Sequence, residues 1–168
     1  QPVLHKLDNE VSQIMIDNII EKGLKYQLAH SFDHRTNPAE RSVQTFKNHF
    51  ISILFGTDDK FPANQWDRLI PQAVMTLNML RPSRINPRIS AYNQIWGNFD
   101  FNRTPLAPAG CKVAVHKSPE ARETFAAHGK IGFYVGPSMH HYQNYEIYVK
   151  ETGGIRNAAT VDFFPQHV

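Results

Sequence analysis

The chain has 168 residues, enough for one ordinary domain or for a domain and a small module. Its 9 Gly and 11 Pro exclude a collagen-like or low-complexity chain, and 41% hydrophobic residues are enough to build a core. A single cysteine excludes a disulfide framework, and the net charge of +3 permits a nucleic-acid partner without demanding one. No apolar run is long enough to span a bilayer, so we expect no membrane partner.

The first part of the chain alternates between strand and helix patterns. In chain order, the apolar spacing predicts a strand over 3–7, a helix over 9–22, a strand over 24–28, a helix over 37–54, a helix over 64–80 and a short helix around 90–96. We expect Pro71 to kink the helix over 64–80. The side chains expected to be buried on the two longest helices are Val43, Phe46, Phe50 and Leu54, then Trp66, Leu69, Ala73 and Leu77.

After about Thr104 the pattern changes to short stretches of alternating apolar residues, which is typical of strands. Four strands are expected, near 113–115, 131–135, 145–149 and 161–163, with turns at Gly136-Pro137 and Gly153-Gly154. The sequence therefore predicts an α/β part over 1–105 and a small all-β module over 106–168.

Two carboxylates occupy positions that suit chemistry. Asp8 ends the first expected strand, and Glu40 lies in the first turn of the helix over 37–54. The elements between them can bring the pair together at one end of a sheet, where open α/β sheets place their sites. Paired carboxylates suit Mg²⁺, and two such ions are a common device of nucleases and phosphoryl transferases.

Both carboxylates also fit a structural role. Asn37-Pro38-Ala39-Glu40 matches the first positions of a helix, so Glu40 could be half of a capping box. Asp8 could be the N-cap of the helix that begins at Asn9. Capping and catalysis are compatible, so both interpretations stay open.

Candidate nucleic-acid contacts follow these carboxylates. Gln44 and Lys47 lie one and two turns beyond Glu40 on nearly the same helix face, within reach of a phosphate backbone. Lys47 could instead be a solvated charge. A later strip without acidic residues could contact phosphates, with bases over its aromatic rings, or could be a loop with two core aromatics. The residues of this strip are Arg81, Arg84 and Arg88, interleaved with Tyr92 and Trp96.

Other reactive residues form no motif that indicates chemistry. Cys111 has no activating pattern, and the sequence has neither a nucleophile elbow nor a Gly-rich phosphate loop. The His140-His141 pair fits a turn between strands better than a metal site.

Taken together, these residues resemble the integrase of copia-type LTR retrotransposons. Leu7-Asp8-Asn9 and Asn37-Pro38-Ala39-Glu40-Arg41 are similar to the second half of its catalytic core. The further similar stretches are Gln65-Trp66-Asp67 through Asn78-Met79-Leu80-Arg81, Ser90-Ala91-Tyr92-Asn93-Gln94-Ile95-Trp96-Gly97, Gly110-Cys111-Lys112-Val113-Ala114-Val115-His116, Gly132-Phe133-Tyr134-Val135-Gly136 and His141-Tyr142-Gln143-Asn144-Tyr145. The last three resemble the small barrel that follows the core.

The resemblance implies a partial RNase-H-like core over 1–105, without its first strands, and a Src-homology-3-like β-barrel over 106–168. It implies an Asp, Asp, Glu set that holds two Mg²⁺ or Mn²⁺ ions, in which Asp8 is the second Asp and Glu40 is the Glu. Lys47 is then the lysine that meets the DNA end of the element. The implied activity is DNA 3′-end processing and strand transfer into target DNA, in the nucleus, by a protein that can form a homo-oligomer.

The sequence departs from the family pattern in ways that define the alternatives. The first Asp and the zinc segment are expected upstream of Gln1, so we expect this fragment alone to be inactive. Glu10 and Pro38 stand where the family has glycines, and the spacing from Asp8 to Glu40 is shorter than usual. One alternative is a non-catalytic nucleic-acid- or protein-binding remnant of a mobile-element polyprotein. The other is an unrelated α/β protein in which both carboxylates cap helices.

Overall fold

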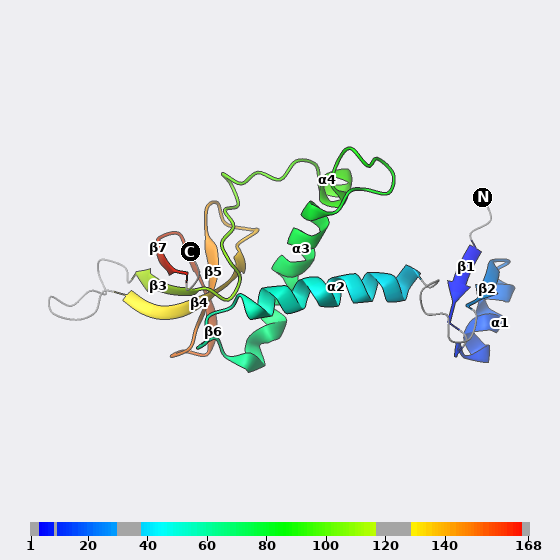
Figure 1. Ribbon diagram of the computed structural model, residues 1–168, viewed down its shortest axis with the longest axis horizontal. Coiled ribbons are helices and arrows are strands. Elements are labelled where there is room, and N and C mark those ends of the chain that lie inside the picture. The colour runs from blue at the N-terminus through cyan, green and yellow to red at the C-terminus, as the bar shows by residue number, and fades with distance from the viewer. Residues whose placement is uncertain (1–3, 9, 30–37, 117–128, 166–168) are drawn as a thin grey trace. The chain divides into compact units, whose positions relative to one another are not determined.

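The computed structural model describes residues 4–8, 10–29, 38–116 and 129–165. The chain is a mixed α/β protein with two compact units, over 1–48 and 49–168 (Figure 1). The boundary expected near residue 105 falls inside the second unit, and the division into a core and a barrel stays a prediction. Within the described ranges, no helix combines the length and apolar character needed to cross a membrane.

The first unit contains a parallel strand–helix–strand arrangement. Strand β1 (Leu4–Leu7) pairs in parallel with β2 (Lys25–Leu28), and helix α1 (Gln13–Glu21) connects them. The expected helix start at residue 9 was wrong, because the Val11 N–H donates to the Asp8 carbonyl in a turn and Ser12 is the N-cap. The helix ends at Glu21, and Gly23 just beyond its C-cap Lys22 has a φ of 65°, which glycine adopts readily.

Helix α2 (Pro38–Phe55) agrees closely with the helix predicted over 37–54. Phe50 is buried as expected, and its ring packs edge-on against Trp66 with centroids 6.0 Å apart. Val43 was expected on the same buried stripe but is 58% exposed. The apolar packing of this helix is therefore concentrated at its C-terminal end, in the second unit.

The single kinked helix expected over 64–80 is two helices. A 3₁₀ segment, η2 (Ala63–Leu69), leads into α3 (Ile70–Leu80), and Pro71 lies in the first turn of α3. Proline is tolerated there because N–H groups in the first turn of a helix have no intrahelical acceptor, so the N–H that proline lacks is not needed. Leu69 and Ala73 are fully buried as predicted, whereas Trp66 is about half exposed, contrary to the prediction.

Helix α4 (Ala91–Trp96) confirms the short helix predicted around 90–96. Ser90 is its N-cap, and the Ser90 Oγ accepts a hydrogen bond from the Asn93 N–H over 3.0 Å. Gly97 ends the helix with a φ of 80°.

The second unit contains an antiparallel sheet with strand order β6-β5-β4-β3-β7. Figure 1 shows its strands curled and crossing at steep angles. The strands are β3 (Lys112–His116), β4 (Gly129–Pro137), β5 (Tyr145–Val149), β6 (Gly154–Ala158) and β7 (Val161–Phe164). Four of them were predicted. The edge strand β6 was not, because Ile155 is the only large apolar residue in it and Gly153-Gly154, where the strand begins, indicated a turn.

The core of this sheet lies on one face of β4. Tyr134 is fully buried there, in a cluster whose other members are Val113, Val115, Ile147 and Val149. Burial raises the pKa of the Tyr134 phenol far above its usual value, so the side chain stays neutral. On the opposite face of β4, Phe133 packs edge-on against Phe61 with centroids 5.6 Å apart. Both faces of the strand are therefore covered.

Gly132 is required for the close approach of β4 and β5. A Cβ at this position would lie 2.6 Å from Ile147 Cγ2 and 2.8 Å from the Tyr148 carbonyl oxygen. We predict that Gly132→Ala lowers the free energy of unfolding by about 1–3 kcal/mol, because the strand pair must separate. Gly154→Ala is the control, since its Cβ meets nothing closer than Thr152 Oγ1 at 4.0 Å. Denaturant unfolding that shows equal stability for the two variants would contradict this packing.

Candidate functional site

Asp8 stands at the carboxyl end of the parallel strand pair. It directly follows β1, and the Ala29 N–H beyond β2 donates to the Leu7 carbonyl at the same edge over 2.8 Å. The alternative that Asp8 caps α1 is wrong, because that helix begins at Gln13. The Asp8 side chain is exposed at the edge where parallel α/β units place their sites.

Glu40 lies in the first turn of α2, as predicted. A carboxylate there also interacts favourably with the helix dipole. Gln44 and Lys47 follow four and seven residues later, so the three side chains share one helix face. Both are exposed, and Gln44 Nε2 donates to Asn48 Oδ1 over 2.9 Å. The face is thus a row of one anion, one amide and one cation.

The capping box and the meeting of the two carboxylates depend on residues 30–37, which lie outside the described residues. The roles of Asn37 as a cap and of Asp8 and Glu40 as a pair therefore stay predictions. Carboxylate oxygens are the donors that Mg²⁺ and Mn²⁺ prefer, so both side chains fit such ions chemically. In the described ranges, no group of three or more His, Cys, Asp or Glu side chains could hold a metal ion.

The three arginines of the basic strip lie on one loop between α3 and α4. Arg81 follows α3 directly, and its carbonyl accepts from the Ala91 N–H over 2.8 Å. Pro82 and Ser90 form an isolated antiparallel bridge. These contacts bring the two ends of the loop together.

The buried Ser83 side chain organises this loop from inside. Its Oγ accepts from the Ile85 and Asn86 N–H groups over 3.1 and 3.3 Å. Arg84 and Arg88 are consequently exposed, while Arg81 is half-buried. Among the residues that the structure describes, none of the three arginines forms an ion pair with a carboxylate.

The aromatic residues of the strip have different environments. Trp96 is 74% exposed, so the alternative that both rings belong to the core is wrong for this residue. Tyr92 is half-buried and packs edge-on against Phe99 with centroids 5.5 Å apart. Both rings line a cavity.

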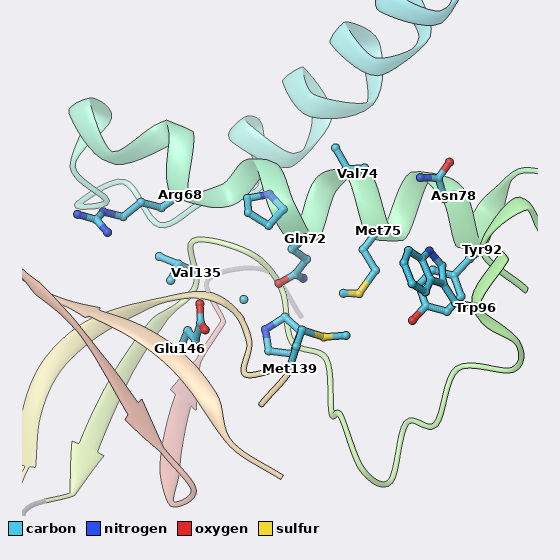
Figure 2. Close-up of a pocket in the computed structure, with 13 residues that line it drawn as sticks. Arg68, Gln72, Val74, Met75, Asn78, Tyr92, Trp96, Val135, Met139 and Glu146 are labelled. Atoms are coloured by element: carbon cyan, nitrogen blue, oxygen red, sulfur yellow. The ribbon is translucent and has the colours of Figure 1, made fainter. Parts of the chain in front are cut away.

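This cavity, of about 350 Å³, lies between α3 and α4 on one side and β4 and β5 on the other. Figure 2 shows Tyr92 and Trp96 at one end of it, Arg68 and Glu146 at the other, and Gln72 between them. Most of the remaining wall is apolar. The other lining residues are Pro71, Val74, Met75, Asn78, Val135, Gly136, Pro137 and Met139.

Sequence reasoning missed Gln72, Arg68 and Glu146 as site residues. Gln72 gave a signal, because it is a polar residue one position before Ala73 on the helix face predicted to be buried. Arg68 and Glu146 gave none, since they come from η2 and β5 and line the same cavity only in the folded unit.

Cys111 and the histidine pair behave as the sequence predicts. His140 and His141 lie between β4 and β5, and His141 Nδ1 is 3.0 Å from Ser138 Oγ. Cys111 is buried, and its Sγ donates to the Lys112 carbonyl. Burial raises the pKa of the Cys111 thiol, with a smaller contribution in the same direction from the charge of Asp58.

We predict that Cys111 resists alkylation by iodoacetamide in the native protein, because its thiolate is both rare and inaccessible. Since the pKa is raised, raising the pH through the range in which an ordinary thiol ionises should give little acceleration while the fold persists. The same thiol should react fully in guanidinium chloride. Fast native-state labelling, measured by mass spectrometry, would contradict the burial of this side chain.

Comparison of the sequence with models of known protein families and with curated proteins finds no match.

Proposed function

We propose that the chain is part of a DNA integrase similar to those of copia-type retrotransposons. Residues 1–105 would be the second half of an RNase-H-like catalytic core, and 106–168 a Src-homology-3-like barrel. Its activity in the whole protein is metal-dependent DNA 3′-end processing and strand transfer, with element ends and target DNA as partners in the nucleus.

The observation that carries the proposal is the position of the two carboxylates. Asp8 follows the first strand of a parallel β1-α1-β2 unit, and Glu40 lies in the first turn of the next helix. This order of elements is what the resemblance requires. Because Ser12 and not Asp8 is the N-cap of α1, helix capping does not explain an aspartate at position 8.

Asp8 and Glu40 are the residues that would hold Mg²⁺ or Mn²⁺, each through carboxylate oxygens. When bound, the ions would activate water and stabilise the leaving oxygen of a phosphoryl transfer. The proposal assigns two of the family's three carboxylates to this chain, so metal binding is the property to measure on it.

The exposed side chains beyond Glu40 would position the nucleic acid. Lys47 lies about 10 Å along the helix from Glu40, a span that reaches from a metal site to the next phosphates. Gln44 lies between them and can donate a hydrogen bond. Arg84 and Arg88 would add phosphate contacts from their loop, with Arg81 at its base.

A second candidate is a non-catalytic nucleic-acid-binding remnant of a mobile-element polyprotein. The basic loop favours it, because its exposed arginines have no ion pair within the described part of the chain. The two candidates differ in whether the carboxylates bind a metal, so metal and DNA binding are tested separately.

The metal test compares Glu40→Gln with wild type by Mn²⁺ titration in NMR. In wild type we predict paramagnetic broadening of amide signals around both Asp8 and Glu40. Glu40→Gln should weaken Mn²⁺ binding at least about tenfold, or ~1.4 kcal/mol, because a neutral amide is a poor ligand for this ion. Asp8→Asn should do the same, and Glu21→Gln on α1 is the control. Unchanged Mn²⁺ affinity in the first two variants would remove the carboxylate pair from the mechanism.

The DNA test uses the double variant Arg84→Gln, Arg88→Gln and a labelled duplex. Binding measured by fluorescence anisotropy should give a plot of log affinity against log salt whose slope is shallower than that of wild type by about two units. The reason is that a protein with two phosphate contacts fewer releases about two counterions fewer on binding. The control double variant, Lys150→Gln, Arg156→Gln, removes the same charge from other exposed positions. An identical slope in wild type and the loop variant would exclude phosphate contacts by this loop.

A further inference from the structure

A second pocket, of about 460 Å³, lies within the second unit, where the C-terminal end of α2 leads through a turn into η2. Aromatic and acidic side chains line it together. The lining residues are Leu54, Phe55, Thr57, Asp58, Asp59, Phe61, Ala63 and Trp66. Two of these lining residues are aspartates and none is Lys, Arg or His, so this acidic pocket carries negative charge in a chain whose net charge is +3.

One of the two aspartates has a buried carboxylate with an oxygen that a ligand can reach. Asp58 is 5% exposed, and its Oδ1 accepts a hydrogen bond from the Lys60 N–H over 2.9 Å. Within the described part of the chain, its Oδ2 has no hydrogen-bond or ion-pair partner. The unpaired side-chain atoms that are sealed from solvent there are Gln72 Oε1 and Tyr134 Oη, so Asp58 Oδ2 keeps accessible surface. This oxygen is therefore open to a ligand in the pocket that Asp58 lines.

The basic side chains near the acidic pocket do not neutralise it. A buried carboxylate needs hydrogen bonds or a compensating positive charge to remain an anion at low cost. Lys60 is exposed, and within the described ranges its ammonium forms no ion pair with Asp58 or Asp59. The Arg68 guanidinium lies elsewhere, 5.5 Å over the Tyr148 ring. A positively charged ligand can therefore supply the compensating charge.

Three aromatic rings complete the wall of the acidic pocket. Phe61 is held by edge-on packing against Phe133, with centroids 5.6 Å apart. Trp66 is held in the same way by Phe50 at 6.0 Å, and 49% of it remains exposed. Phe55, at the end of α2, is 84% exposed. The faces of such rings attract cations, and several rings together are the usual site for a quaternary ammonium group.

The rings and carboxylates together favour an organic cation over a metal ion. Ca²⁺ takes about six to eight oxygen ligands, whereas this pocket offers two carboxylates, and Asp58 Oδ1 is already bonded to the backbone. A quaternary ammonium group has no N–H donors, so no hydrogen bond is left unmade when aromatic rings replace the water around it. Its methyl groups can pack on the rings while its charge faces the carboxylates.

We propose that the acidic pocket binds a quaternary ammonium group, which packs against the rings of Phe55, Phe61 and Trp66 and is balanced in charge by Asp58 and Asp59. Choline and the trimethyllysine side chain both carry this group. The pocket involves neither Asp8 nor Glu40, so the inference does not depend on the proposed function.

The experiment titrates the whole chain with choline and with 3,3-dimethyl-1-butanol at constant ionic strength, followed by ¹H–¹⁵N NMR. Choline should shift the Trp66 indole N–H and the amides at the C-terminal end of α2 in a saturable way. The butanol has the same shape with carbon in place of the charged nitrogen, so it should bind at least about tenfold more weakly. Equal affinities for the two probes, or Ca²⁺ that displaces choline at a lower concentration, would overturn the proposal.

Peptides separate the two sources of the group. A trimethyllysine peptide that binds more tightly than choline would identify a protein segment as the source, and the reverse order would identify a small molecule or a lipid headgroup. Both results agree with the proposal. The same peptide with unmodified lysine should bind more weakly than choline, and unmodified lysine that binds as tightly as choline would contradict the preference for a quaternary ammonium.

Two pairs of variants test the location of the site. Phe55 and Phe101 are both exposed phenylalanines, but only Phe55 lines the acidic pocket. Phe55→Ala should weaken choline binding several-fold, whereas Phe101→Ala should bind choline as wild type does. Asp58→Asn keeps an acceptor for the Lys60 N–H but removes the charge, so it should weaken binding about tenfold, with the exposed Asp67→Asn as its control. Undiminished choline binding by Phe55→Ala and Asp58→Asn would overturn the proposal, and neither measurement requires DNA or a metal.

Discussion

Strand β4 is the constraint on which the second unit depends, because both of its faces must be covered. Tyr134 faces the core shared with β3 and β5, while Phe133 packs on Phe61 and Val135 lines the cavity beside α3. The segment before β3 is also held by this strand, since the Gly110 N–H donates to the Tyr134 carbonyl and the Tyr134 N–H to the Cys111 carbonyl. The sheet and the helical segment are therefore packed around one strand, and the cavity exists where that packing is incomplete.

Most elements could be predicted from the sequence because their signals are local. The α2 and α4 helices and four strands of the sheet follow from apolar spacing. Gly136, Pro137 and Gly154 were expected in turns, but they lie in β4 and β6. The errors arise where the spacing of apolar residues identifies an apolar face of a helix but not the element that covers it. Val43 and Trp66 continue the predicted apolar stripes yet are each about half exposed. Pro71 fits either a kink or a helix start, and only packing around Leu69 and Ala73 decides for the start.

The candidate sites also differ in how far local sequence patterns could predict them. The positions of Asp8 at a strand end and Glu40 in a first helical turn were predictable, because each depends on one element. Whether the two carboxylates meet depends on the conformation of the chain between them, which no local pattern determines. The cavity could not be predicted at all, since α3, α4, β4 and β5 supply its walls from distant parts of the sequence.

The central claim is that the carboxylates of Asp8 and Glu40 meet and share divalent ions. Anomalous scattering from crystals of the chain soaked with Mn²⁺ tests it most directly. We predict a metal peak about 2.1 Å from an oxygen of each carboxylate. Carboxylates more than about 10 Å apart, with no ion bridging them, would contradict it, because ions that act together in phosphoryl transfer lie only about 4 Å from one another.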